Sequence, residues 1–197
     1  MDMSDIYLYS VAIYPVISVM DSVKRFKDDL ASSIGWYGSR NSKAHITICE
    51  FNADAERELV SIKSQLQRLC ATESPLDLKF DHVGMYENKV NGVACLLPDK
   101  ETEEILKPLM KRIGKGLKVK NIFGSNNPHI TIGRKLNKEQ VSFATDLFKD
   151  TKVNLNFICD RVVLRVLNRS IGQFEVIEEF IFQSKTPRLA DGQLLMF

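Results

Sequence analysis

Two copies of one tetrapeptide contain the residues best suited to chemistry in this chain. His45-Ile46-Thr47-Ile48 recurs as His129-Ile130-Thr131-Ile132, and the two copies hold two of the three histidines. Histidine has an unperturbed pKa of about 6.5, so it can accept or donate a proton near neutral pH. Residues i and i+2 of a β-strand face the same side, so each histidine would share a face with the threonine of its copy. Two such strands around one cavity would supply a base, an acid and two hydroxyl groups.

That set of groups suits the cleavage of a phosphodiester. One histidine removes the proton of the attacking oxygen, and the other protonates the leaving oxygen on the far side of phosphorus. The threonine hydroxyls can donate hydrogen bonds to the non-bridging oxygens as negative charge develops on them. We therefore predict that His45, Thr47, His129 and Thr131 are catalytic and that neither a metal nor a cofactor is needed. The residues alone do not say which histidine is the base.

The segments around the two tetrapeptides also match. Tyr37-Gly38-Ser39-Arg40-Asn41 precedes the first copy, and Phe123-Gly124-Ser125-Asn126-Asn127 precedes the second. An amphipathic helical pattern follows each copy after a short gap. We interpret the chain as one supersecondary unit used twice, which predicts an α+β fold with two lobes in a single domain.

The local patterns predict the elements that position these residues. Asp21 and Thr102 are the expected caps of the first and third helices, and a turn is expected over residues 87–91. The tail at 190–197 is expected to pack back onto the domain. Strands are expected at 6–14, 45–51, 76–86, 92–97, 129–134, 153–167 and 174–182, and helices at 21–34, 54–70, 102–114 and 137–149.

Four further residues are predicted to bind the substrate. Tyr37 and Phe123 lie in the two preceding loops, where an aromatic ring can stack on a base or pack against its neighbours. Lys43 could attract a phosphate or simply be solvated. Strict alternation would place Arg134 on the strand face opposite His129, so Arg134 reaches the cleft only if the strand twists or bulges.

Composition limits the classes of function. The chain has 197 residues and a net charge of +2, which is too mild for a strong, sequence-independent grip on long nucleic acid. The apolar stretch at 6–20 is too short for a membrane helix, and acidic rather than basic residues precede it, unlike in a signal peptide. The four cysteines, Cys49, Cys70, Cys95 and Cys159, form no paired motif. We expect a cytoplasmic monomer that acts on RNA ends or small nucleotides and does not engage a membrane.

The two motifs together resemble those of the 2H phosphoesterase superfamily, which includes the bacterial RNA 2′,5′-ligase-like proteins and the RNA 2′,3′-cyclic phosphodiesterases. Pro128-His129-Ile130-Thr131-Ile132-Gly133-Arg134 is especially similar to the second motif of that family, and Ala44 to Phe51 fits the first. The resemblance in element order covers nearly the whole chain. It implies two antiparallel sheets with helices outside, and a central cleft that carries both motifs.

The resemblance also implies metal-independent hydrolysis of 2′,3′-cyclic phosphates or 2′,5′ linkages. It implies that His129 activates water and that His45 protonates the leaving oxygen. The long polar loop before each motif departs from the commonest bacterial pattern, which leaves the exact substrate open.

Three alternatives remain at this stage. The protein could ligate 2′,5′ bonds rather than hydrolyse them, or it could bind an RNA end or a nucleotide without turnover. A metal hydrolase built on His45, His129 and His82 would need carboxylates at ligand spacing, which the sequence does not place beside the histidines. His82 has no matching copy in the other half, and we interpret it as structural.

Overall fold

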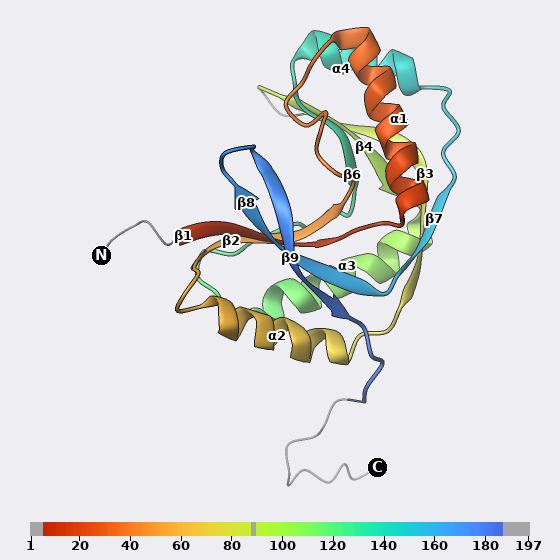
Figure 1. Cartoon of the computed structure of the whole chain (residues 1–197). Coiled ribbons are helices and arrows are strands. Elements are labelled where there is room, and N and C mark those ends of the chain that lie inside the picture. The colour runs from red at the N-terminus through yellow and green to blue at the C-terminus, as the bar shows by residue number, and fades with distance from the viewer. Residues whose placement is uncertain (1–5, 88–89, 187–197) are drawn as a thin grey trace, which may run out of the picture.

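A computed structural model describes residues 6–87 and 90–186 (Figure 1). The expected turn around Asn88 and Lys89 lies partly outside the described residues, and the expected tail at 190–197 lies wholly outside them. The elements, in chain order, are β1 (Ile6–Ile13), α1 (Ile17–Ile34), β2 (Ile46–Asp54), α2 (Leu59–Ala71), β3 (Leu76–Glu87), β4 (Gly92–Pro98), α3 (Lys100–Gly116), β5 (Phe123–Gly124), β6 (Ile130–Leu136), α4 (Lys138–Phe148), β7 (Leu155–Cys159), β8 (Arg161–Asn168) and β9 (Gln173–Ile181).

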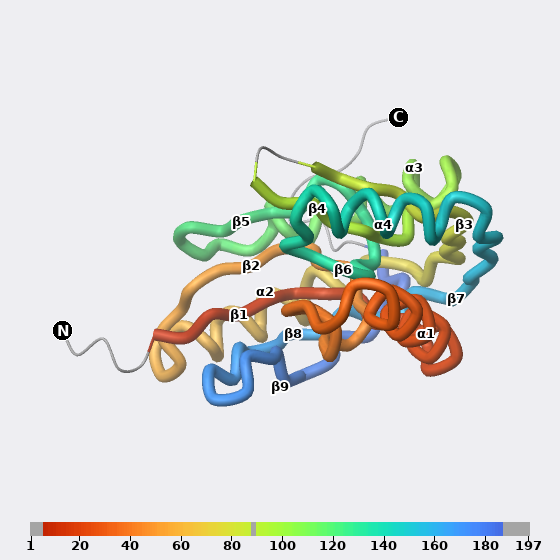
Figure 2. Tube along the Cα trace, turned by 90° about the horizontal axis from the view of Figure 1, so that it is seen from above, coloured from red at the N-terminus to blue at the C-terminus, as the bar shows by residue number. Residues whose placement is uncertain are grey.

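The strands form two antiparallel sheets, which confirms the α+β class. The first sheet has the order β5-β2-β1-β8-β9, and the second has the order β6-β4-β3-β7. β2 begins directly after His45 and β6 directly after His129, so each sheet has one His-x-Thr motif at the start of a strand. Seen from above, β1 lies between β2 and β8 (Figure 2).

The connecting helices tie the two sheets together. α1 joins two strands of the first sheet, yet it packs on β6 and β7 of the second sheet and on α4. α3 connects β4 of the second sheet to β5 of the first, and it contacts β2 of the first sheet as well as β3 and β4 of the second. Figure 1 shows α1 and α4 together beside β3, β4 and β6, and α2 and α3 together beneath β1 and β2. Because α1 and α3 each reach across to the other sheet, the apolar core is continuous between them.

One expected strand proves to be two. The apolar run at 153–167 is interrupted at Asp160, and its halves β7 and β8 belong to different sheets. β-Propensity marks both halves alike, so the pattern could not show that the chain changes sheet between them. β5 is a further strand inside a segment expected to be a loop, and it is only two residues long.

The helix starts also differ from expectation. α1 begins four residues before Asp21, after Val16, which offers no side-chain cap. Asp99, not Thr102, caps α3 by accepting a hydrogen bond from the Thr102 backbone N–H. The Thr102 hydroxyl instead accepts from the backbone N–H of Lys79 on β3, at 2.8 Å. The helix after β6 begins as expected, because Asn137 and Gln140 form a reciprocal capping box.

These caps give a matched test of stability. Replacing Asn137 with alanine leaves the backbone N–H of Gln140 in α4 without its partner, so we expect the free energy of unfolding to fall by about 1 kcal/mol. Asp21→Ala is the control, because Asp21 is exposed inside α1 and should change stability by less than about 0.5 kcal/mol. Chemical denaturation of both variants measures the difference. Equal losses in the two variants would contradict the assigned caps.

Candidate active site

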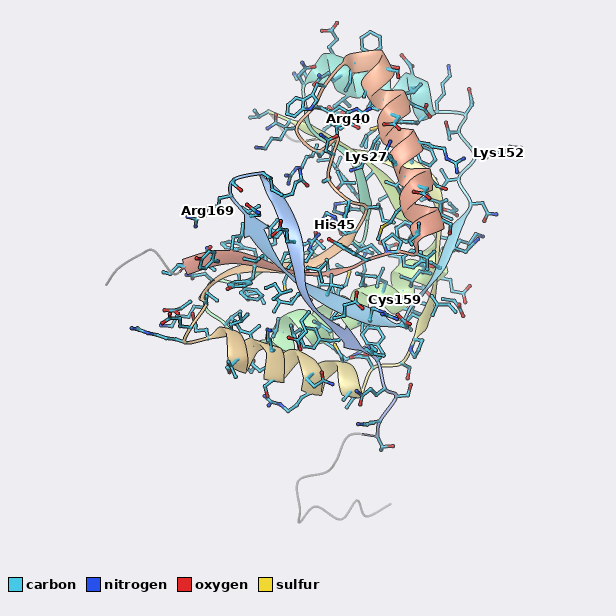
Figure 3. All side chains as sticks on the ribbon, in the orientation of Figure 1. Lys27, Arg40, His45, Lys152, Cys159 and Arg169 are labelled. Atoms are coloured by element: carbon cyan, nitrogen blue, oxygen red, sulfur yellow. The ribbon has the colours of Figure 1, made fainter. Side chains whose placement is uncertain are left out.

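A cleft of about 900 Å³ brings both motifs together. His45 and His129 line it, and so do Thr47 and Thr131. Within the described residues, neither threonine hydroxyl has a hydrogen-bond partner in the protein, so both can donate to a ligand. His45 lies near the centre of the molecule (Figure 3). Apolar side chains form another wall of the cleft, contributed by β1, β8, β9 and the β8–β9 turn: Leu8, Leu167, Ile171, Phe174 and Val176.

The two histidines are held in the same way. The Nδ1 atom of His45 lies 2.7 Å from the carbonyl oxygen of Lys43, and that of His129 lies 2.8 Å from the carbonyl oxygen of Asn127. A carbonyl oxygen can only accept, so Nδ1 carries the proton in both rings. Nε2 is then the atom left for acid–base chemistry. Each ring also lies beside a tyrosine, with centroids 6.3 Å apart for Tyr14 and His45 and 6.1 Å apart for Tyr86 and His129.

Both motif strands bulge at the last residue of the tetrapeptide. In the first sheet, Val11 of β1 pairs with Cys49 of β2, and the next residue, Ala12, pairs with Thr47. Ile48 is therefore the extra, unpaired residue of β2. In the second sheet, Ala94 of β4 pairs with Gly133 of β6, and the next residue, Cys95, pairs with Thr131. Ile132 is therefore the extra, unpaired residue of β6. A bulge shifts the alternation of side chains by one position. The residue five positions after each histidine therefore turns into the cleft.

Those two residues have opposite charges. Glu50 stands five positions after His45, and Arg134 stands five positions after His129; both line the cleft. The bulge required to bring Arg134 to the face of His129 is thus present in β6. Glu50 was not singled out from the sequence, although its place in the repeated pattern is the same as that of Arg134. The two halves of the site are alike in their histidines and threonines and differ in this charge.

The two preceding loops cross over to the opposite motif strands. The backbone N–H of Arg134 on β6 donates to the Ser39 hydroxyl at 3.0 Å. In the reciprocal contact, Ser125 N–H donates to the carbonyl of Ile48 on β2 at 2.9 Å, and β5 pairs with β2 through Gly124 and Cys49. Ser39 and Ser125 occupy equivalent places in the two loops. Each loop therefore bonds to the strand that carries the other histidine.

A buried lysine on α1 fixes the first loop. The Lys27 ammonium donates to the carbonyl oxygens of Ser39 and Ser42 at 3.0 and 2.7 Å, and to the Ser42 hydroxyl at 3.0 Å. Burial, helped by the charge of Arg134, lowers the pKa of Lys27 to about 8. The carbonyl that holds His45 belongs to Lys43, the next residue. Lys27 thus holds the turn from which His45 extends.

The predicted substrate-binding residues divide into two groups. Lys43 and Arg134 line the cleft, and both side chains are exposed. Tyr37 is buried, its hydroxyl donates to the carbonyl of Lys27, and it does not line the cleft. Phe123 is 69% exposed on β5 and is likewise absent from the cleft lining. His82 is exposed on β3 beside Asp81, away from the lining residues.

Sequence reasoning missed one further cation in the cleft. Arg165 lies on β8 in a run of apolar residues, Val162-Val163-Leu164-Arg165-Val166-Leu167. Its neighbour across the strands is Ser10, which pairs with Arg165 on one side and with Glu50 on the other. The three residues form a polar row across the first sheet. A charged residue within a buried apolar strand was the available signal.

The electrostatic environment of the cleft keeps His45 neutral. Burial is the main cause and the like charge of Arg165 is the second, and together they lower the pKa of His45 to about 3. The hydrogen bond to the Lys43 carbonyl partly opposes this effect, while Lys27 and His129 add to it.

This pKa leads to a direct prediction. An unperturbed imidazole would gain its proton near pH 6.5, whereas His45 should remain neutral from about pH 8 down to about pH 5. Heteronuclear NMR of the ring signals, assigned with a His45→Asn variant, measures this. A titration midpoint near 6.5 for the His45 signals would contradict the described environment.

Comparisons with known proteins agree with the fold. The family model of the 2'-5' RNA ligase superfamily matches residues 18–170. The crystal structure of TT0787 of Thermus thermophilus superposes with a TM-score of 0.61 at 15% identity, covering 91% of this chain and 100% of that one. The crystal structure of E. coli LigT in apo form superposes with a TM-score of 0.64 at 12% identity, covering 91% of this chain and 99% of that one. The structure of Usb1 of Kluyveromyces marxianus superposes with a TM-score of 0.53 at 13% identity, covering 89% of this chain and 98% of that one.

A comparison with curated proteins finds no match for the sequence. In the described part of the chain, no helix is long and apolar enough to cross a membrane. The family model spans most of the chain, and the solved structures share its two-sheet architecture over nearly their whole length. The protein therefore belongs to the 2'-5' RNA ligase superfamily, within the 2H phosphoesterases.

Proposed function

We propose that the protein is a phosphodiesterase that acts on RNA or nucleotide 2′,3′-cyclic phosphates or 2′,5′ bonds, with His45 and His129 as its acid–base pair. The observation that carries the proposal is that both Nε2 atoms belong to rings that line one cleft and are fixed by the same Nδ1 hydrogen bond. Structures of E. coli LigT were solved with 3′-AMP and with phosphate, and Usb1 was solved with uridine monophosphate. These ligands support a nucleotide substrate here.

The lowered pKa of His45 suggests how the two roles are divided. A neutral imidazole whose Nδ1 is already a donor presents the Nε2 lone pair, so His45 can accept the proton of the attacking oxygen. His129 then delivers a proton to the leaving oxygen. This division is the reverse of the one that the family resemblance implies. The hydroxyls of Thr47 and Thr131 donate to the non-bridging oxygens in both descriptions.

The reaction needs no metal under this proposal. The two imidazoles supply the proton transfers, and Arg134 and the threonine hydroxyls supply donors for the developing negative charge. Turnover is therefore expected to continue in EDTA. The apolar wall of the cleft offers a surface for the nucleoside. The opposite charges of Glu50 and Arg134 make the two halves of the cleft chemically distinct.

The test compares three histidine variants on one substrate panel. We expect His45→Ala and His129→Ala each to lower kcat/KM by about 100-fold to 10,000-fold, because each removes one proton transfer. His82→Ala is the matched control, because His82 lies outside the cleft. The panel holds 2′,3′-cyclic nucleotides, RNA with cyclic-phosphate ends and 2′,5′-linked oligonucleotides, assayed in EDTA with the regiochemistry of the products determined.

Four outcomes would overturn this proposal. Loss of all turnover in EDTA would remove the metal-independent mechanism, and full activity of both cleft variants would remove the histidine pair. Binding of the panel without any product would assign the cleft to a non-catalytic nucleotide-binding module. Joining of 2′,5′ bonds without hydrolysis would make the protein a ligase.

A further inference from the structure

Arg165 is a buried cation without an anionic partner at contact distance. It is only 2% exposed and is the largest of the fully buried side chains in the described residues. None of the ion pairs in residues 6–87 and 90–186 includes it. Burying a charge without a partner is costly, and proteins normally pair such groups or lower their charge. Burial lowers the pKa of Arg165, whereas interactions with Tyr14 and Glu50 partly oppose this shift. The guanidinium nevertheless stays protonated, as it does in proteins generally.

The contacts that Arg165 does make fix its orientation and leave donors free. One Nη2 hydrogen donates to the Ser10 hydroxyl at 2.7 Å. The guanidinium carbon lies 4.9 Å from the ring centroid of Phe174 and 5.5 Å from that of Tyr14. Its buried Nε–H, however, has no hydrogen-bond partner within the part of the chain that the structure describes. The aromatic faces thus hold a charged fork whose hydrogen-bonding capacity is only partly used.

Its position connects this unused capacity to the cleft. Arg165 lines the same cleft as His45 and His129, and its charge acts on His45. The other basic residues are placed differently: Arg134 and Lys43 are exposed at the cleft, and Arg40 pairs with Asp28 at 2.8 Å. Arg165 is the cleft cation that is removed from water and not neutralised by a carboxylate at contact distance.

We propose that Arg165 binds a phosphate oxygen of the ligand at the floor of the cleft, beside His45, through its guanidinium group. A phosphate there would supply the missing anion, and guanidinium matches the geometry of phosphate oxygens. The inference rests on the proposed function only in taking a phosphate ester as the ligand. A nucleotide with this phosphate on Arg165 would place its phosphorus near the Nε2 atom of His45.

The experiment measures the binding of inorganic phosphate rather than turnover. Arg165→Met keeps similar volume without charge, and we expect its Kd for phosphate to rise by about tenfold to a hundredfold. Arg165→Lys should lose less, because it retains the charge without the planar fork. Arg169→Met is the control, because Arg169 is exposed at the β8–β9 turn and lies outside the cleft lining (Figure 3).

A second readout separates loss of binding from loss of fold. Removing an unpaired buried charge should leave the unfolding temperature of Arg165→Met within about 4 °C of the wild type. The His45 ring signals in that variant should also titrate at a higher pH, since the like charge is gone. If Arg165→Met does not fold, Arg165→Lys decides the question through the same phosphate titration.

Unchanged phosphate affinity in a folded Arg165→Met protein would overturn the inference, as would equal losses in Arg165→Met and Arg169→Met. These results differ from those that test the proposed function. An enzyme that turns over substrate yet binds phosphate equally well without Arg165 would retain the function and lose the inference. A protein that binds phosphate through Arg165 but cleaves no substrate would support the inference and contradict the proposed function.

Discussion

The reciprocal attachment of each preceding loop to the opposite motif strand is the constraint on which the site depends. The Ser39 hydroxyl accepts from the backbone of Arg134, and Ser125 donates to the backbone of Ile48. Each loop also holds its own histidine through a carbonyl two residues earlier. The distance between the two imidazoles is therefore set by short hydrogen bonds in the middle of the molecule. The helices that cross between the sheets support this arrangement by joining the two cores.

The site is symmetric in its chemistry and asymmetric in its electrostatics. Both halves supply a histidine, a threonine, a neighbouring tyrosine and a bulge at the same place. They differ because Glu50 stands where the other half has Arg134, and because the charge of Arg165 helps to lower the pKa of His45. A cleft with two equivalent ends could accept a phosphodiester in either direction. The unequal charges make the two halves of this cleft chemically distinct.

The exact repeat is a strong local signal, and it predicted the candidate site residues and an α+β fold with two lobes; the two antiparallel sheets were implied by the family resemblance of the motifs. The sequence could not predict that β7 and β8 belong to different sheets, since apolar alternation carries no information about partners. Tyr37 and Phe123 occupy equivalent loop positions, yet one is buried and the other is exposed, which only tertiary packing decides. Arg165 lies far along the chain from both motifs, and its place in the cleft depends on the pairing of β8 with β1.

The most direct measurement of the central claim is a crystal structure of the protein with orthovanadate and a nucleoside, which together mimic a phosphoryl-transfer transition state. We expect one vanadium atom between the two rings, with an oxygen on each side within about 3 Å of a histidine Nε2. An equatorial oxygen should face Arg165. Vanadate bound to one histidine only, or bound outside the cleft, would contradict this geometry.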